Sequence, residues 1–473
     1  MTQSFVNTLS MRRSEPARPT AFVLLAMCLG VFIAQLDSSV VYLGAHTISA
    51  ALNASITQTQ WVLDIYNLIY AALLMTGGAL GDILGRRRIF VAGIALIALG
   101  SLICALAPNS LVLIGGRAVT GVGSALEIPA SLAILAVTYP DPHARGRAIG
   151  VWASCNGLAM AAGPSIGGFL VDSLGWRSMF YIVIPVCVLA IGLALGRVDE
   201  SRDPGKREID PAGQLLAIAT LGALSFVAIE GPHRGWTAPL IGAVAAIGVA
   251  SAIGFVRVER GRTTALLPFD MFGNRAFNAA LCLAGLMTFG MYAMLFLAPI
   301  YLQSVVGLSA ATAGLALMPI SLVFVAVSQV SGPLMKGVGA RVMTACGMGF
   351  MGGGLVLLVL TLEGANLIAI EAALVVIGVG LGLNTGPVNS VAVASVAPGR
   401  SGTASGLINT TRMIGATLGI ASLGTIYAVY AANPADALTG FQLALGGGAA
   451  AELSGVLIAL AFIAANSAEQ QHR

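Results

Sequence analysis

The sequence predicts an all-α protein that crosses a lipid bilayer 14 times, and three observations lead to this fold class. First, 57% of the 473 residues are hydrophobic and only 9% are charged, whereas soluble domains carry about a quarter charged residues. Second, apolar runs of roughly 20 residues, the length of a membrane span, recur along the whole chain. Third, Lys and Arg gather in alternate loops, which is typical of multi-pass membrane proteins.

Turn residues and charges divide the chain into 14 predicted spans. They cover residues 21–43, 58–80, 89–107, 110–132, 148–171, 176–196, 212–229, 238–256, 277–301, 310–332, 342–362, 367–390, 402–426 and 441–465. All but four of the 24 Lys and Arg residues fall in the tails or in loops on one side of such a bundle. The exceptions are Arg177 and Arg234 in opposite loops, and Arg117 and Arg412 within spans. Because positive charge marks cytoplasmic loops, we expect both termini in the cytoplasm.

The loop after the second span resembles the loop after the tenth. Residues 78–88 read GALGDILGRRR and residues 332–341 read GPLMKGVGAR, which aligns Gly85 with Gly339. This degraded repeat predicts two six-helix bundles. The predicted parts are a cytoplasmic tail (1–20), a first bundle (21–196), a linker with two additional helices (197–276), a second bundle (277–465) and a C-terminal tail (466–473). Apart from Glu230 at one end, the two-helix insert holds no acid within its spans, so we expect it to be peripheral to transport.

The segment after the second span carries a family motif, formed by Gly78, Asp82, Gly85, Arg86 and Arg87. It resembles the loop motif of the 14-span drug:proton antiporter family of the major facilitator superfamily, a family that includes quaternary-ammonium and multidrug exporters. The resemblance runs over most of the chain, is densest in residues 36–180, and implies the major facilitator fold. It also implies that this loop is a gating latch between the bundles. Glycines permit a tight turn, and the arginines can clamp carboxylates or lipid phosphates. A loop that only sets topology is the alternative.

A second motif lies in the fifth predicted span and consists of Gly157, Gly163, Pro164, Gly167 and Gly168. It resembles the motif that this superfamily associates with exporters rather than importers. Physically, its glycines let helices approach closely, while Pro164 frees a backbone carbonyl and bends the helix. A packing helix without a transport role would look partly similar.

Three charged residues of the first bundle share one level in the membrane. Asp37, Asp64 and Arg117 all lie roughly 9 to 10 Å from the same face. Charges in spans normally face a cavity and pair, so we expect Arg117 to bind Asp37 and protonation of Asp37 to release it. The family resemblance also assigns proton coupling to this first-helix acid, and a static ion pair is the alternative. Glu127, about 280° around the helix from Arg117, is either a second proton site or a partner for another helix.

Asp64 lies between Trp61 and Tyr66, in a segment similar to helix 2 of quaternary-ammonium and dye exporters. An acid beside aromatic rings suits lipophilic cations, although such rings near a span end also serve as membrane anchors. Asn384 and Asn389 are predicted to line the cavity, or else to form hydrogen bonds between helices. Further candidates are charges near mid-membrane, Arg412 and Glu452, which we expect to pair.

Together these features predict a proton-coupled antiporter of the inner (cytoplasmic) membrane that exports lipophilic, cationic drugs or antimicrobials by alternating access. An exporter of one antibiotic or metabolite, and a proton-coupled uptake symporter, are the alternatives. The expected partners are a small-molecule substrate, protons and the lipid bilayer, and the oligomeric state is open, with a monomer sufficient.

Several classes of function find no support in the sequence. No P-loop is present and no loop exceeds about twenty residues, so we expect no enzyme, no cofactor and no drive other than the proton gradient. The net charge of +4 belongs to the loops and does not indicate nucleic-acid binding. The cysteines lie in apolar stretches without CxxC spacing, so we expect no metal site and read them as small core residues; they are Cys28, Cys104, Cys155, Cys187, Cys282 and Cys346.

Overall fold

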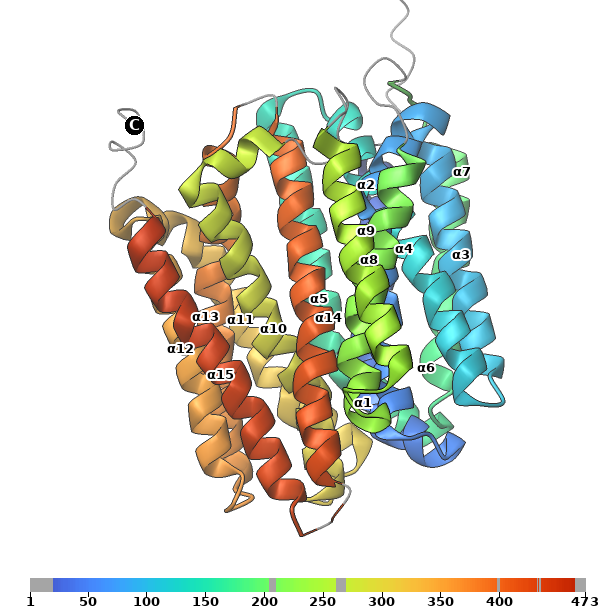
Figure 1. Ribbon diagram of the computed structural model, residues 1–473. Helices are drawn as coiled ribbons and strands as arrows, with labels where there is room; N and C mark the ends of the chain where they lie inside the picture. Colours follow the sequence, from blue (N-terminus) through green and yellow to red (C-terminus); the bar gives the residue numbers. More distant parts are fainter. Residues whose placement is uncertain are drawn as a thin grey trace, which may run out of the picture.

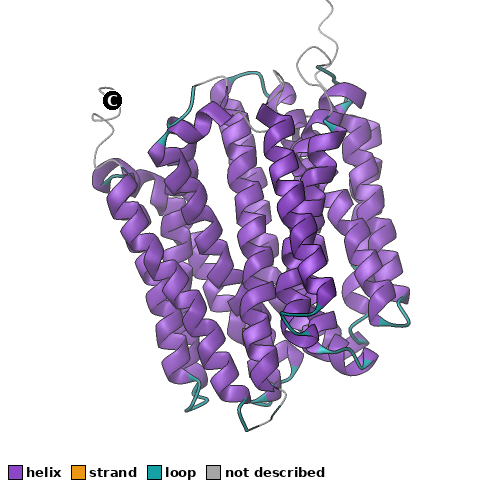
Figure 2. Ribbon diagram, viewed as in Figure 1, coloured by secondary structure: helices purple, strands orange, loops and turns teal. Residues whose placement is uncertain are grey.

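The computed structural model describes residues 20–203, 210–260, 269–397, 400–431, 433 and 435–463, and all regular structure within them is helical (Figure 2). In these residues, 14 helical segments are long and apolar enough to cross a membrane, which confirms the predicted count. Residues 1–19 and 464–473, which hold most of the two predicted tails, lie outside the described residues.

The first bundle contains seven helical segments among the described residues, because its sixth span is interrupted at Ile182. They are α1 (Thr20–Leu52), α2 (Ile56–Leu84), α3 (Arg86–Leu106), α4 (Ser110–Thr138), α5 (Pro142–Leu174), α6 (Ser178–Tyr181) and α7 (Val183–Arg197). The insert consists of α8 (Pro211–Arg234) and α9 (Pro239–Arg260), followed by the short η1 (Phe269–Gly273). The second bundle holds α10 (Arg275–Ser304), α11 (Ala310–Val338), α12 (Ala340–Thr361), α13 (Leu367–Ala394), α14 (Ser401–Ala431) and α15 (Ala437–Phe462).

Helix ends follow local capping signals and extend beyond several predicted spans. The start of α2 carries a capping box, in which the Ser55 hydroxyl accepts from the N–H of Gln58 and the Gln58 side chain accepts from the N–H of Ser55. Gly85 separates α2 from α3 with φ of 116°, and Gly339 separates α11 from α12 with φ of 84°. Residues other than glycine rarely adopt a positive φ. The aligned glycines therefore make equivalent turns in both halves of the repeat.

Each bundle meets the other through matching helices (Figure 1). The second span of the first bundle, α2, packs against the fifth span of the second, α14. Equivalently, α5 packs against α11, and the first helices α1 and α10 also touch. This exchange of second and fifth spans is what a two-fold relation between the repeats produces.

The insert is a hairpin of α8 and α9, and one of its helices contacts both bundles. α8 packs against both α2 and α14, so it lies where the two bundles meet (Figure 1). α8 is therefore not at the periphery of the bundles, whereas the expectation that the insert is peripheral to transport stays a prediction. The sequence could not show the position of α8, because an apolar helix is equally compatible with contacts to lipid and to other helices.

The short η1 segment connects the insert to the second bundle. Arg400, just before α14, forms an ion pair with Asp270 of η1, and its hydrogen bond lowers the pKa of that exposed carboxyl. Asn274 also donates to the carbonyl of Ser395 at 3.0 Å. The end of the linker is thus fixed to the second bundle.

The outer surface of the bundle is apolar, as a surface in contact with lipid requires. Large side chains such as Leu111, Leu360 and Ile368 are more than two-thirds exposed. Four cysteines are buried or half-buried, as expected, whereas Cys282 and Cys346 are exposed on the surface and are not core residues.

Candidate functional site

Asp37 of α1 and Arg117 of α4 form an ion pair inside the first bundle. Arg117 Nη1 lies 2.5 Å from Asp37 Oδ2, and both side chains are 1% exposed. Ser101 of α3 donates to the other carboxylate oxygen at 3.4 Å, and Arg117 Nε donates to the carbonyl of Val62 in α2 at 3.3 Å. The expected pair is therefore present, and four helices supply its hydrogen bonds. A buried ion pair is tolerated when additional hydrogen bonds satisfy its remaining polar atoms, as they do here.

Tyr66 of α2 belongs to this same cluster. Its ring centroid lies 4.5 Å from the guanidinium carbon of Arg117, a cation–π contact. The hydroxyl donates to the carbonyl of Ala34 at 3.2 Å and forms a second hydrogen bond with the hydroxyl of Ser124 in α4 at 3.0 Å. Tyr66 therefore stabilises the ion pair within the first bundle.

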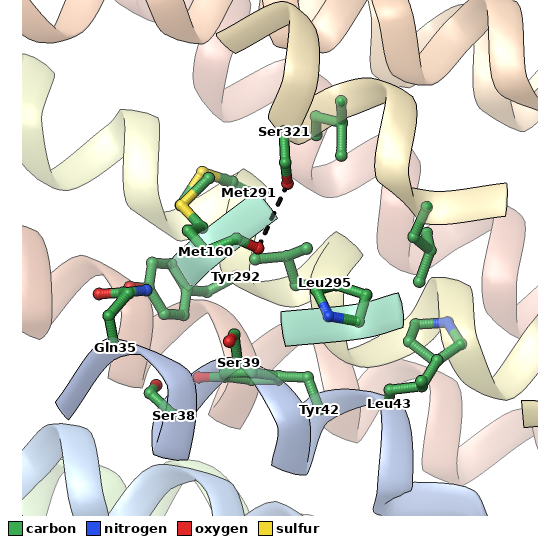
Figure 3. Close-up of a pocket in the computed structure, with 14 residues that line it drawn as sticks. Gln35, Ser38, Ser39, Tyr42, Leu43, Met160, Met291, Tyr292, Leu295 and Ser321 are labelled. Atoms are coloured by element: carbon green, nitrogen blue, oxygen red, sulfur yellow. Dashed lines mark hydrogen bonds between the residues drawn. The ribbon is translucent and has the colours of Figure 1, made fainter. Parts of the chain in front are cut away.

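A pocket lies between the bundles, walled by α1 and α5 on one side and by α10 and α11 on the other (Figure 3). Its lining is mostly apolar and includes Met160, Met291 and Leu295. The polar lining residues carry hydroxyl or amide groups; they are Gln35, Ser38, Ser39, Tyr42, Tyr292 and Ser321. No charged side chain is among the described residues that line it. A concave apolar site with a few polar groups is typical of small-molecule binding.

The pocket and the ion pair share one stretch of α1. Asp37 is followed directly by Ser38 and Ser39, which line the pocket (Figure 3). One turn on, the hydroxyl of Tyr42 accepts from Asn67 of α2 at 2.9 Å, while its ring packs edge-on against Tyr292 of α10 with centroids 5.8 Å apart. α1 therefore connects the buried charges to the wall of the pocket.

Pro164 of α5 has the local effect that its chemistry predicts. A proline has no N–H, so the carbonyl four residues earlier, that of Met160, lacks its helical partner. Ser321 of α11 donates to this carbonyl at 3.5 Å, at the edge of the pocket (Figure 3). The freed carbonyl is thus used for a hydrogen bond between the two bundles.

The glycines of the same motif lie where α5 touches other helices. A Cβ at Gly163 would come within 1.9 Å of the Ser39 hydroxyl in α1, and one at Gly168 within 2.3 Å of the carbonyl of Ala310 in α11. Gly167 faces Val40 of α1, and Gly157 faces Val325 of α11, in the same manner but less tightly. The motif therefore packs α5 closely against a helix of each bundle.

Hydrogen bonds between the bundles also occur at the end where α1 finishes and α11 begins. Asp172 of α5 accepts from the N–H groups of Ala310 and Ala311 at 3.2 and 2.8 Å. Gln303 of α10 donates to the carbonyl of Leu43 in α1 at 3.1 Å. These contacts hold the two bundles together at this end.

Asp64, Trp61 and Tyr66 do not form one subsite, contrary to our expectation. Asp64 and Trp61 face α8, where Trp61 Nε1 donates to Glu230 at 3.2 Å. Tyr66 faces the opposite way, toward Arg117. On a helix, positions 61 and 64 are about 60° apart, whereas position 66 is about 160° from 64. Furthermore, none of the three is among the lining residues of the pocket.

Three acids within the spans are buried, and in the described structure neither carboxylate oxygen of any of them has a hydrogen-bond partner: Asp64, Glu127 and Glu452. Glu127 lies against Gly30 of α1, and Glu452 lies against Gly290 of α10. The predicted pair of Arg412 with Glu452 is wrong, because Arg412 points toward α13 and donates to the carbonyl of Thr385 at 3.3 Å.

The two asparagines of α13 do not line the pocket. Asn384 is buried and donates to the sulfur of Met348 in α12 at 3.0 Å, which is the helix-packing alternative. Asn389 is partly exposed and is not among the residues around the pocket. As candidates for substrate contact, neither is supported by its position.

The predicted latch motif contacts the segment that follows α7. Arg86 binds Asp82 at 2.8 Å within the motif, and Gly78 lies in α2 about one turn before Asp82. Glu200 accepts from the N–H groups of Arg87 and Arg88 at the start of α3, at 3.0 and 3.3 Å. A carboxylate at a helix start is favourable. These contacts join the loop to the linker, a connection that the motif itself did not reveal.

Sequence reasoning missed most of the pocket. Gln35, Ser38 and Ser39 were detectable as polar residues flanking Asp37 in an apolar span. In contrast, Tyr292 and Ser321 carry no local signal, since single hydroxyls are common in spans. Their role follows only from the packing of the second bundle onto the first.

Comparisons with known proteins agree with this arrangement. The sequence profile of the Major Facilitator Superfamily matches residues 27–420. The chain is 34% identical over 416 residues to the multidrug resistance protein Stp of Mycobacterium tuberculosis, covering 87% of this chain and 77% of that protein. It is 32% identical over 459 residues to the multidrug efflux pump LfrA of Mycolicibacterium smegmatis, covering 97% and 91%.

The fold is also similar to that of solved transporters. A POT family transporter in complex with 5-aminolevulinic acid superposes with a TM-score of 0.71 at 15% sequence identity, covering 94% of this chain and 96% of the other. At this identity the likeness concerns the fold alone.

Proposed function

Because the chain belongs to the major facilitator superfamily, we propose that it exports lipophilic, drug-like small molecules in exchange for protons. The names of its relatives, a multidrug resistance protein and a multidrug efflux pump, support export. It acts in the cytoplasmic membrane with both termini inside, by rocking of the two bundles about the pocket between them. The proton gradient is the driving force.

The observation that carries this proposal is that Asp37, which is paired with Arg117, directly precedes the pocket residue Ser38 on α1. Protonation of Asp37 removes the charge that Arg117 binds, and α1 carries both Asp37 and the pocket residues Ser38 and Tyr42. A change in the ion pair therefore acts on the substrate site through a single helix.

The pocket indicates the chemistry of the substrate. Its described lining offers methionine, aromatic and hydroxyl groups without a charge, so it suits the apolar body of a lipophilic compound. A preference for cations would rest on Asp64, which lies outside this lining. An exporter of one uncharged antibiotic is the second candidate, and the neutral pocket is the observation that favours it.

Contacts between the bundles indicate which state of the proposed cycle this conformation represents. Asp172 and Gln303 join the bundles at the end far from the start of α1, which in the proposed topology is the external face. We assign this conformation to a state closed to the outside.

Efflux of ethidium from energised vesicles tests the proposal. We expect Asp37→Asn to abolish flux driven by a pH gradient, because the amide cannot exchange a proton. Asp436→Asn is the matched control, since Asp436 lies in an exposed loop and its partner is the neighbouring Asn433. Unchanged flux in Asp37→Asn would refute the coupling role, and uptake in place of efflux would establish the symporter.

A further inference from the structure

The first helix of the insert, α8, is fastened to α2 at both of its ends. Near its start, the side chain of Gln214 donates to the carbonyl of Ala72 and also binds the hydroxyl of Thr76. Near its end, Glu230 accepts from the indole N–H of Trp61 at 3.2 Å. Two attachments this far apart fix the whole helix to the first bundle.

On its other side, α8 meets α14 of the second bundle. Thr425 donates to the carbonyl of Ala228 at 3.3 Å. Directly alongside, Gln60 of α2 donates to the carbonyl of Ile420 in α14 at 3.0 Å. The junction of α2, α8 and α14 is therefore a contact between the bundles that includes the insert.

Asp64 is enclosed at this junction. Its side chain is fully buried, and the hydroxyls of Ser225 in α8 and Thr417 in α14 lie next to it. All three side chains are buried, and in the described structure none of these oxygens forms a hydrogen bond. Polar groups from three helices thus meet at one place without a well-formed hydrogen bond, and burial of this kind disfavours the charged form of a carboxyl.

Charged side chains of α8 and α14 form contacts of their own. Glu230 of α8 is held by Trp61 and Arg234, and Arg412 of α14 donates to α13. The immediate neighbours of the Asp64 carboxyl are thus neutral hydroxyls, which can donate to its charged form and accept from its protonated form.

We propose that α8 belongs to the proton-coupling machinery, with Ser225 as a positioning residue that stabilises Asp64 in its charged form. When the bundles separate at this junction, α14 and Thr417 move away while α8 and Ser225 stay with α2. Water then reaches Asp64, the carboxyl releases its proton to that water, and Ser225 donates a hydrogen bond to the carboxylate. When the junction closes, Asp64 must take a proton back, because its charged form has no counter-ion there. The two-helix insert thereby helps to set the pH at which Asp64 exchanges its proton, a step that rests on the proposed proton-coupled function.

Infrared difference spectroscopy of the purified protein tests this directly. The carbonyl band of protonated Asp64 is identified by its absence in Asp64→Asn, and its disappearance is followed with rising pH. Ser225→Ala removes one donor to the charged form, so we expect the band to persist to a pH about one unit higher. Ser225→Thr should restore the original pH. Ser251→Ala, the same change at a buried position of α9, is the matched control and should leave it unchanged.

The outcomes separate this proposal from the general one. A Ser225→Ala titration equal to that of the parent protein would overturn it, as would an equal shift in Ser251→Ala. If the alanine variant does not fold, Ser225→Cys replaces it. This change keeps a similar volume and weakens the donor, so the infrared band of Asp64 should again persist to a higher pH. The pH profile of ethidium efflux must shift in parallel with the infrared titration; a titration shift without it would remove Asp64 from coupling. Absence of gradient-driven efflux in the parent protein would instead refute the proposed function.

Discussion

At the scale of single residues, the Asp37–Arg117 pair shows how the first bundle accommodates charge. Each member is 1% exposed, and a charge buried to this degree is tolerated only with a counter-charge and further hydrogen bonds. Val62 and Ser101 provide those bonds from two more helices. The pair therefore depends on all four helices keeping their positions.

Arg117→Ala should destabilise the protein strongly, because it leaves Asp37 buried without its counter-ion. Loss of one partner of a buried pair costs about 3 to 5 kcal/mol, whereas Asp37→Asn combined with Arg117→Ala should recover most of that loss. Thermal unfolding in detergent measures both. Arg88→Ala, which removes a side chain that is 67% exposed, serves as the control and should cost less than about 1 kcal/mol. Equal stability of Arg117→Ala and the double variant would show that the unpaired Asp37 carboxylate is not the cause of the loss.

At the scale of helices, α5 combines close packing with a broken hydrogen-bond ladder. Gly163 and Gly168 bring it against α1 and α11. Pro164 makes the carbonyl of Met160 available, and Ser321 uses it. A contact of this kind is formed between side chain and backbone across the bundle interface, so it can break and re-form as the bundles move without disturbing either helix.

Pro164 and Ser321 should show coupled effects on stability. Ser321→Ala removes the only described partner of the Met160 carbonyl, which should cost about 0.5 to 1.5 kcal/mol. In a Pro164→Ala background, the restored N–H satisfies this carbonyl within α5, and the cost of Ser321→Ala should fall close to zero. A double-mutant cycle on unfolding temperatures measures the coupling. Ser165→Ala, which removes a separate contact to Met318, should cost the same in both backgrounds.

At the scale of the whole molecule, the two bundles touch through α2–α14, α5–α11 and α1–α10. α8 packs against both helices of the α2–α14 junction. The contacts of Asp172 and Gln303 lie at one end of the bundle. If the bundles separate at that end and pivot about the pocket, the pocket opens to the side of the membrane from which these contacts now close it.

Asp172→Asn should favour that opening. The variant keeps an acceptor but loses the charge at the start of α11, an interaction of about 1 kcal/mol, so the open state should gain roughly fivefold in population. Labelling of Ser38→Cys by a membrane-impermeant thiol reagent, in a background without the native cysteines, reports this opening. Asp141→Asn is the control, because Asp141 caps its own helix through the N–H of Ala144. Slower labelling in Asp172→Asn than in the parent would contradict the assignment of this end as the closed one.

Much of this organisation follows from the sequence. Apolar runs determined the number of spans, because hydrocarbon excludes unsatisfied backbone and most charge. The repeated loop located Gly85 and Gly339 at equivalent turns, and equal depth in the membrane brought Asp37 and Arg117 together. In each case the determining quantity is a position along the chain or a depth in the membrane. Both positions follow from residue spacing.

The lateral arrangement was decided only by tertiary structure. Spacing gives the direction of a side chain around its own helix but not the neighbour found in that direction. Asp64 and Tyr66 thus face different helices, and Arg412 does not pair with Glu452. α8 packs at the junction of the two bundles. Inside a membrane, apolar faces gain similarly from lipid and from protein, so hydrophobicity does not select neighbours, and close packing and hydrogen bonds between specific helices do.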